Sequence, residues 1–373
     1  MAASSSQDEI TIVLIGCGCP LRSMGWYHAT QILHGRCPPA AKLRYVVEPF
    51  YMTALGANVD PVGHGKFMEW KAVVETEHDV QFFASTKDVP VDDKQNRLAI
   101  ISARTSDNPM LFEGCVKDIG AKTIFLEKPG APTVTELEQM ANLAMEHGCR
   151  VFMGFNKNVS SYLTRARNYA QGKSCEITFL HNNNYKTDEL SECFERNSEG
   201  MLKNMAIHEL AILVTYYGVT VETIAEVEAD TSFSSCQTLQ GPSSGKEFTD
   251  FDKLKFKITA SNGNVVNVAA DRCGGDDSVA IVTDATSGEE LVRYVMPDED
   301  AVNNIPTLKD KTPGAMPYFY AQDPDYLELK RLVVQSCLDG SDPEGVATIE
   351  IAINTLKVAE YLTPILQEQL KSK

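Results

Sequence analysis

Three side chains, Lys128, His208 and Asn204, have the chemistry and the setting expected of a proton-transfer site. Lys128 lies in the turn FLEKPG, and a partly desolvated lysine exchanges protons closer to neutral pH than a solvated one. His208 can act as an acid or a base near neutral pH. Asn204 precedes it by four residues in a helix predicted over 199–218, which should place both on one helix face. Taken alone, a surface lysine and a buried structural histidine are the simpler interpretations.

A second group of residues could bind a dinucleotide. The apolar run Ile10 to Ile15 stops at Gly16, Gly18 follows as G-x-G, and Gly25 opens a predicted helix. Glycines let the backbone approach a pyrophosphate closely, and a helix N-terminus favours negative charge. Position 21 is Leu, so Gly25 must replace the third glycine of the usual motif after an insertion of about four residues. An ordinary glycine turn between strand and helix is the alternative interpretation.

Glu48 ends a second predicted strand, Leu43 to Val47. In a dinucleotide site, a carboxylate at this place accepts hydrogen bonds from the adenosine ribose. It would repel a 2′-phosphate, which favours NAD over NADP. Arg22 and Arg44 are close in sequence, so NADP stays as the alternative cofactor. A solvated strand end would also explain the residue.

Composition excludes several classes of function. The formal net charge of −17 argues against nucleic acid or an anionic membrane surface as a partner. The N-terminus has no secretory apolar region, and no apolar run is long enough to span a bilayer. The ten cysteines are scattered without C-x-x-C spacing, which predicts reduced thiols in a cytoplasmic protein with no metal site.

Alternating strands and helices predict a doubly wound parallel sheet over residues 1–156, with ligands bound at the carboxyl ends of its strands. Residues 157–373 are richer in strand-like runs and predict an α+β domain with a mostly antiparallel sheet, whose final helices pack back on the first domain. Polar stretches within 181–199 and 300–325 are expected to be loops. The strands expected in the first part are 96–104, 121–129 and 150–156, and the helices are 109–119 and 134–148.

In order and spacing, these features resemble the Gfo/Idh/MocA family of nicotinamide-dependent oxidoreductases, named after glucose-fructose oxidoreductase, inositol dehydrogenase and a rhizopine-catabolism protein. The resemblance covers nearly the whole chain, and E-K-P with the downstream histidine is its most specific part. The matching segments are Gly16 and Gly18 with GWYH (25–28), VVEP (46–49), EKP (127–129), GFN (154–156), GMLKNMAIH (200–208) and the tail from YLELKRL onward.

The resemblance implies a Rossmann domain, an open-faced C-terminal sheet used in homodimers or homotetramers, and hydride transfer between NAD(H) and a small polar substrate. It assigns the handling of the proton to Lys128 and His208. The implied cofactor-binding residues are Gly16, Gly18, Cys19, Gly25, Glu48, Ser102, Arg104, Thr105, Glu127 and Lys128. The implied substrate-binding residues are Asn156, Tyr185, Lys186, Asn204 and His208.

Asn204 departs from the family pattern, because sugar and polyol dehydrogenases of this family usually carry Asp there. The substitution removes a charge that would support a protonated His208, and it leaves room for a ketone or imine substrate. Two alternatives remain open. The chain could be a catalytically inactive NAD-binding regulatory subunit, or a redox-cycling lyase that oxidises and reduces its cofactor within one turnover.

Overall fold

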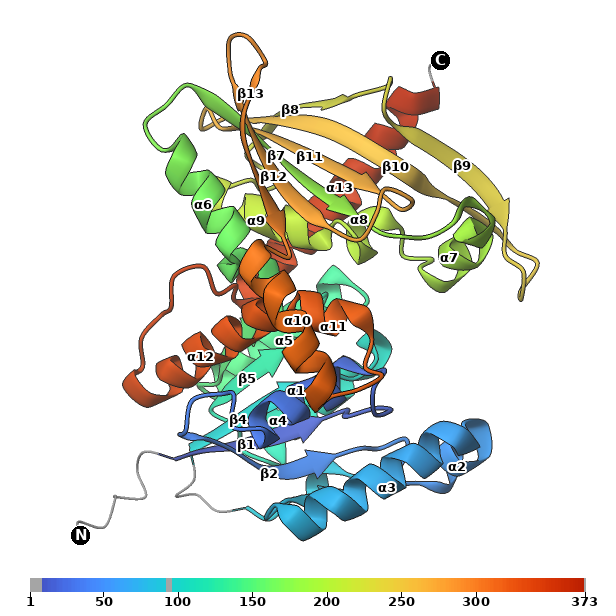
Figure 1. The fold of residues 1–373 in the computed structure, drawn as a ribbon, viewed down its shortest axis with the longest axis vertical. Coiled ribbons are helices and arrows are strands. Elements are labelled where there is room, and N and C mark those ends of the chain that lie inside the picture. The colour runs from blue at the N-terminus through green and yellow to red at the C-terminus, as the bar shows by residue number, and fades with distance from the viewer. Residues whose placement is uncertain (1–8, 92–95, 372–373) are drawn as a thin grey trace. The chain divides into compact units, whose positions relative to one another are not determined.

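The computed structural model describes residues 9–91 and 96–371, which form two compact units (Figure 1). The first unit extends to Phe155 and also includes Asn303–Glu350. The second unit contains Asn156–Val302 and the chain from Ile351 onward.

The first unit is built on a six-stranded parallel sheet in the order β3-β2-β1-β4-β5-β6. This is the strand order of a Rossmann fold, with the topological switch point between β1 and β4. The central strands are continuous apolar runs because both of their faces are covered. The strands are β1 (Ile10–Ile15), β2 (Ala41–Val47), β3 (Gln81–Phe83), β4 (Asn96–Ile101), β5 (Thr123–Leu126) and β6 (Arg150–Met153).

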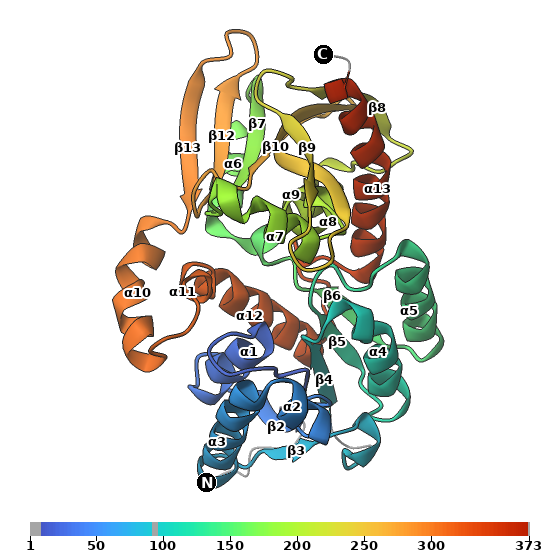
Figure 2. The same cartoon turned by 90° about the vertical axis from the view of Figure 1, so that its right-hand side faces the viewer.

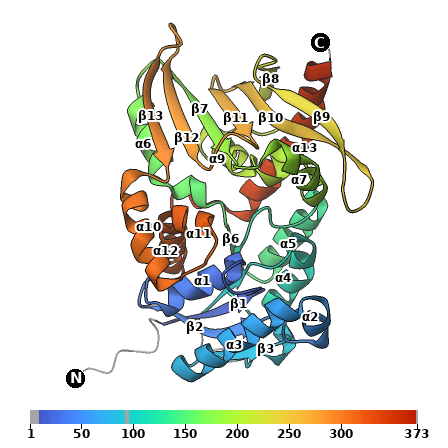
Figure 3. The same ribbon diagram turned by 45° about the vertical axis from the view of Figure 1, so that its right-hand side comes forward.

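Helices cover both faces of this sheet, as the right-handed crossovers between parallel strands require. Helices α1 and α12 lie on one face and α4 and α5 on the other (Figures 2 and 3). The expected doubly wound sheet is therefore confirmed. The helices of this part are α1 (Met24–Leu33), α2 (Ala54–Val59), α3 (Pro61–Glu77), α4 (Asn108–Lys117), α5 (Val134–Glu146), α11 (Pro317–Ala321) and α12 (Asp323–Asp339).

A buried carboxylate attaches α12 to α1. The Asp323 Oδ1 atom accepts hydrogen bonds from Tyr27 Oη at 2.6 Å and Gln31 Nε2 at 2.7 Å, and Arg36 pairs with both carboxylate oxygens. The ring of Phe319 stacks on Tyr27 with the ring centroids 4.7 Å apart. These contacts explain why a segment beyond residue 300 groups with the N-terminal sheet.

The second unit is built on a mixed sheet in the order β13-β12-β7-β11-β10-β8, with β9 paired to β10. Its pairs are antiparallel except β7 with β11, as the predicted mostly antiparallel sheet requires. The strands are β7 (Cys175–Asn182), β8 (Ile224–Ala229), β9 (Ser235–Gln240), β10 (Glu247–Ala260), β11 (Val265–Asp271), β12 (Ser278–Asp284) and β13 (Glu290–Met296).

Alternation along β10 shows why only one face of this sheet is covered. Leu254, Phe256 and Ile258 are buried, whereas Lys255 and Lys257 on the opposite face pair with acidic residues. Helix α6 packs on β12 and β13, and α9 packs on β7 and β11 (Figure 2). The helices are α6 (Ser161–Ala170), α7 (Leu190–Arg196), α8 (Met201–Asn204), α9 (Ile207–Tyr217), α10 (Glu299–Lys311), which continues into the first unit, and α13 (Ile349–Lys371), which joins the second unit from Ile351.

Two expected loops are wrong. Much of 300–325 is helical, because Ala301, Ile305 and Leu308 recur at helical spacing within an acidic segment and form the inner side of α10. Part of 181–199 forms α7, whose Leu190, Cys193 and Phe194 are buried. In both segments the apolar residues are few and lie among many charged ones, so their helical spacing is difficult to recognise in the sequence.

Candidate active site

The glycine turn after β1 has the backbone conformation that a dinucleotide site requires. Gly16 and Gly18 have φ angles of +76° and +71°, which other residues rarely adopt. A Cβ at Gly16 would lie 2.7 Å from the backbone of Ala103. A Cβ at Gly25 would lie 2.2 Å from the carbonyl oxygen of Gly16, so Gly25 allows close helix–strand packing. This is the role predicted for a displaced third glycine.

The side chain of Glu48 contacts this turn. Its carboxylate accepts hydrogen bonds from the backbone N–H of Gly18 at 2.7 Å and of Phe50 at 3.1 Å. Burial raises the pKa of Glu48, and these backbone N–H groups and the charge of Arg104 act in the opposite direction. The Arg104 guanidinium lies 5.4 Å from the centre of the Phe50 ring. Predicted residues from the ends of β1, β2 and β4 therefore gather at the switch point.

A hydrogen bond to Ser23 stabilises the turn between β1 and α1. The Ser23 Oγ atom accepts a hydrogen bond from the Cys19 N–H at 2.9 Å. Within the described residues, no side chain caps the first turn of α1. Because first-turn N–H groups lack intrahelical partners, they stay suited to an anion.

Glu127 lies in a buried chain of three side chains. Its Oε1 atom is 2.9 Å from Nε2 of His28, and Nδ1 of His28 is 2.9 Å from Nζ of Lys330. Burial and the charge of Lys330 lower the pKa of His28 to about 4, so this imidazole is neutral near pH 7. Lys128 follows directly and is joined to Pro129 by a cis peptide bond. The structure thus gives Glu127 a role in holding the E-K-P turn that the sequence did not indicate.

In the second unit, His208 lies beside a buried charge cluster. Glu209, the next residue of α9, is fully buried, with Oε1 2.6 Å from Nζ of Lys157 and Oε2 3.1 Å from Nδ1 of His181. The rings of His181 and His208 are 6.4 Å apart between centroids. Although burial raises the pKa of Glu209, the charges of Lys157, His181 and His208 outweigh this effect and hold the pKa well below its usual range.

The single helix predicted over 199–218 is wrong, because the structure forms α8 and α9 with a break between them. The Ala206 N–H bonds to the carbonyl of Met201, five residues back instead of four. This wider turn changes the helical register between Asn204 and His208. The four-residue spacing therefore no longer places these two side chains on one helix face.

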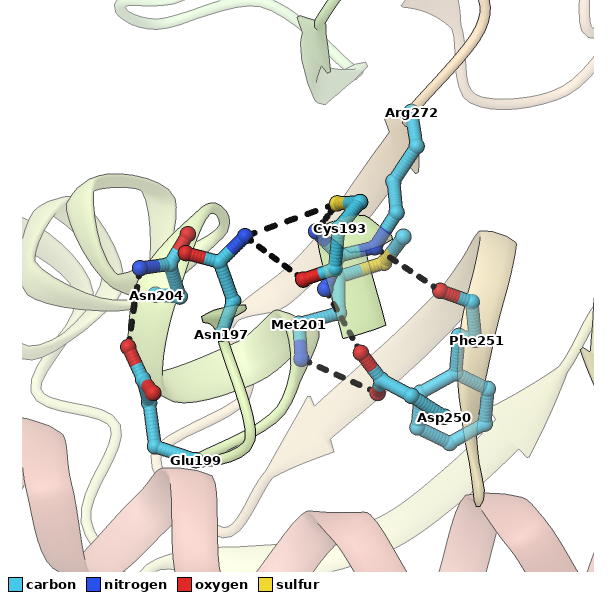
Figure 4. Close-up of polar contacts among 8 residues, drawn as sticks. All are labelled: Cys193, Asn197, Glu199, Met201, Asn204, Asp250, Phe251 and Arg272. Atoms are coloured by element: carbon cyan, nitrogen blue, oxygen red, sulfur yellow. Dashed lines mark hydrogen bonds and ion pairs between the residues drawn. The ribbon is translucent and has the colours of Figure 1, made fainter. Parts of the chain in front are cut away.

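Figure 4 shows how the segment before α9 is held. Buried Arg272 donates hydrogen bonds to Asp250 at 2.6 Å and to the Cys193 sulfur at 3.0 Å. The other Asp250 oxygen accepts the N–H of Met201, the first residue of α8, at 3.0 Å. In the same view, the Asn204 amide donates to Glu199 at 2.9 Å. A buried ion pair thus anchors the start of the helix that ends at Asn204.

The remaining predicted residues have simpler surroundings. Ser102 and Thr105 follow β4 and are half-buried, and Asn156 is fully buried in a 3₁₀ turn. The Tyr185 hydroxyl accepts a hydrogen bond from Arg196 at 2.8 Å, whereas Lys186 is exposed. The prediction that Lys128 and His208 approach each other remains a prediction, since the two residues belong to different units.

Five charged or titratable residues near these sites were not singled out from the sequence: His28, Lys157, His181, Glu209 and Lys330. Glu209 did carry a signal, because it is a carboxylate within the otherwise apolar segment of α9. A charged residue in such a run predicts a buried partner. The partner itself could not be found from sequence spacing.

All ten cysteines are free thiols. Within 9–91 and 96–371, no cluster of three or more His, Cys, Asp or Glu side chains could hold a metal ion. In the same residues, none of the helices combines the length and the apolar character needed to cross a membrane.

Comparison with known proteins finds the fold but no sequence relative. No family model matches the chain, and no curated protein matches it by sequence. Scyllo-inositol dehydrogenase from Lactobacillus casei, solved with NAD(H) and scyllo-inositol, superposes with a TM-score of 0.65 at 16% identity, covering 98% of this chain and 97% of its own.

Two further solved structures are similar over almost their full length. Myo-inositol dehydrogenase from Corynebacterium glutamicum has a TM-score of 0.64 at 18% identity and covers 98% of this chain and 97% of its own. UDP-N-acetylglucosamine 3-dehydrogenase from Acidithiobacillus ferrooxidans has a TM-score of 0.60 at 14% identity, covering 97% and 99% respectively. The chain shares the two-part fold of these dehydrogenases.

Proposed function

We propose that this chain is a nicotinamide-dependent oxidoreductase that transfers a hydride between NAD(H) and a hydroxyl, carbonyl or imine carbon of a small polar substrate. The observation that carries the proposal is the glycine turn at the β1–β4 switch point, where two left-handed glycines meet a close-packed helix N-terminus. The likeness to a dehydrogenase solved with NAD(H) over nearly its whole length supports the same conclusion.

The residues around the turn fit a dinucleotide. Gly16 and Gly18 would let a pyrophosphate approach the backbone, and the first-turn N–H groups of α1 would bind it. The buried carboxylate of Glu48 would face the adenosine ribose and disfavour a 2′-phosphate, so NAD is preferred to NADP. When bound, the nicotinamide would supply the hydride acceptor or donor.

The chain's own residues would handle the proton. Lys128, in the rigid turn held by Glu127, would orient the substrate oxygen or nitrogen and donate to it. His208, next to the Glu209 cluster, would accept or return the proton. Asn204 would hydrogen-bond the substrate without changing its own charge. Ser102, Thr105, Asn156, Tyr185 and Lys186 are the further residues proposed to line the site.

Cofactor binding can be tested with a matched pair of glycine variants. Gly16→Ala should abolish NADH binding, because the new Cβ meets Ala103 and the backbone must leave φ +76°. Gly65→Ala is the control, since a Cβ there meets nothing within 4 Å. Fluorescence titration with NADH and NADPH would measure both affinities. Equal binding by the Gly16 variant and the wild type would contradict the proposed dinucleotide site.

Turnover separates the proposal from its alternatives. The purified chain would be assayed with NAD⁺ or NADH against polyols, sugars, ketones, aldehydes and imines. A change in NADH absorbance with one class supports the oxidoreductase. Tight NADH binding without turnover across the panel would favour a regulatory subunit, and substrate conversion without net NADH change would favour a redox-cycling lyase. Sedimentation analysis would test the proposed homodimer or homotetramer.

A further inference from the structure

We propose that His181, oriented by Glu209, is an acid–base residue in addition to Lys128 and His208, and that it exchanges the reaction's proton with solvent. The inference rests on the proposed function for its reaction, but the His181–Glu209 pair is a property of the protein alone. His181 comes from the end of β7 and Glu209 from α9, so the pair joins the sheet to the helix that carries His208.

The geometry begins with a carboxylate that has no contact with water. The Glu209 side chain is 0% exposed, and each of its oxygens has a different partner, Lys157 Nζ at 2.6 Å and His181 Nδ1 at 3.1 Å. An isolated buried carboxylate would take up a proton, but the neighbouring ammonium of Lys157 keeps it ionised. Lys157 therefore preserves Glu209 as a hydrogen-bond acceptor for the imidazole.

The tautomer of His181 follows from this bond. An ionised carboxylate can only accept, so Nδ1 of His181 must carry the hydrogen. In the neutral ring the lone pair then lies on Nε2, which is the atom able to take a proton. A carboxylate that fixes one imidazole nitrogen and supports the imidazolium is the arrangement that makes histidine an effective base.

Exposure distinguishes His181 from its neighbours. Its side chain is 15% exposed, whereas those of Glu209 and Lys157 are 0% and 2% exposed. Its titratable neighbours include Glu209 and His208, and Lys157 lies on the far side of the Glu209 carboxylate. The two residues opposite it on the neighbouring strands, Ala270 and Ser278, do not titrate near neutral pH, and Asp271 and Asp277 flank the next position, Asn182.

The proton transfer balances within these groups. In the oxidation direction, the substrate O–H bond breaks and its proton forms a bond to Nε2 of His181, directly or after passing through His208. The Lys157–Glu209–His181 cluster changes from net zero to net +1 charge, and the ionised Glu209 stabilises the imidazolium. Loss of the Nε2 proton to water restores the neutral ring. The electrons leave with the hydride, which is the part of the reaction covered by the proposed function.

The first test does not depend on activity. Long-range ¹H–¹⁵N spectra of the full chain, labelled at its seven histidines, report tautomer and titration. The His181 signals would be assigned by their loss in His181→Gln, with exposed His147→Gln as the assignment control. We expect the Nδ1–H tautomer at His181, and a titration midpoint that moves to lower pH in Glu209→Gln because the carboxylate charge is lost. An Nε2–H tautomer in the wild type would contradict the proposed hydrogen bond from His181 Nδ1 to Glu209.

The second test concerns the acid–base role and uses a substrate found in the turnover screen. His181→Ala should lower kcat by roughly 10²-fold with NADH affinity unchanged, and added imidazole should restore part of the loss. The pH profile of kcat should lose the midpoint assigned to His181 by the spectra. Unchanged kcat and pH profile in this variant would refute the acid–base role. A wild type that is inactive on every substrate would count against the proposed function. The spectra would still show whether Glu209 fixes the tautomer of His181.

Discussion

Each unit of this protein contains a trio of one lysine, one histidine and one glutamate in contact, but the order of the side chains differs. In the first unit the histidine is central, since His28 lies between Lys330 and Glu127. In the second unit the carboxylate is central, since Glu209 lies between Lys157 and His181. The same three residue types therefore produce two different electrostatic settings.

The central position removes His28 from proton exchange. Its ring is fully buried, and a proton on it would lie beside the ammonium of Lys330, which is why its pKa falls to about 4. The neutral ring accepts from Lys330 at Nδ1 and donates to Glu127 from Nε2. This trio connects α1, α12 and the E-K-P turn and acts as a structural element.

The end position gives His181 a different setting, with a carboxylate as its direct partner. Glu209 is held ionised by Lys157, so a proton on His181 is supported by the carboxylate and opposed less directly by the lysine. The comparison teaches that burial of a Lys–His–Glu set does not by itself indicate proton chemistry. We expect the position of the imidazole within the set, and its exposure, to decide whether it can exchange a proton.

The largest expected effect is a difference in the free energy of unfolding between variants of Lys157 and of Lys330. Lys157→Met removes the cation bound directly to the buried Glu209 carboxylate and should lower the free energy of unfolding by about 3–5 kcal/mol. Lys330→Met removes a cation bound to a neutral ring, so its loss should be smaller. Urea denaturation at pH 7 of both variants measures the difference. Equal losses would show that the order of the trio has no energetic consequence.

The second expected effect is that the two trios lose their contribution to stability over different pH ranges. The folded pKa of His28, about 4, lies below the unfolded value of 6.5, so its contribution is present above pH 6.5 and is lost as the pH falls towards 4. The loss reaches up to about 3 kcal/mol. The folded pKa of Glu209 is also lowered, from 4.5, so its contribution is lost only at pH values below about 4.5.

His28→Gln would isolate the first of these pH ranges. The variant should be less stable than the wild type at pH 7 and should lack the His28 part of the decline between pH 6.5 and 4. Chemical denaturation at intervals of half a pH unit measures both slopes. A variant whose stability declines as steeply as the wild type over this range would show that His28 is not held neutral.

Catalysis should depend far more on Lys128 than on Lys330. Lys128→Met should reduce turnover by roughly 10²-fold, equivalent to about 2.7 kcal/mol in the activation free energy, with NADH affinity nearly intact. Lys330→Met should keep turnover within a few-fold of the wild type, because Lys330 supports the turn only through His28 and Glu127. Steady-state rates for both variants test the contrast. An unchanged turnover number in the Lys128 variant would remove this residue from the proposed mechanism.

The smallest expected effect concerns the half-buried amide of Asn204. Asn204→Asp would replace an amide that donates to Glu199 by a second carboxylate and should destabilise the protein by about 0.5–1 kcal/mol. The double variant Glu199→Gln/Asn204→Asp should recover most of this loss. A thermal-unfolding double-mutant cycle measures the coupling. The same Asp should raise activity towards polyols relative to ketones, if position 204 contacts the substrate as proposed.

Much of the first unit could be predicted from local pattern. Burial on both faces requires a continuous apolar strand, so the apolar runs of β1 and β2 could be recognised from their own residues. The same holds for the glycines after β1 and the E-K-P turn after β5. The break between α8 and α9 could not be predicted, because both sides of it are good helical sequence. The start of α8 is likewise held by the Met201 N–H bond to Asp250, a residue 49 positions away that Arg272 contacts, and no local pattern reveals this bond.

The sequence by itself determined the alternation of strands and helices and the glycine turn, and it singled out Lys128 and His208 as candidates for proton transfer. These depend on residue type and near neighbours along the chain. Only the tertiary structure decided that His28 is central in one trio and His181 terminal in the other. The Glu209 contacts span 52 and 28 residues, and the His28 contacts span 99 and 302. Because electrostatic energy depends on distance and burial in space, no spacing along the chain could reveal that His28 stays neutral or that Glu209 contacts His181.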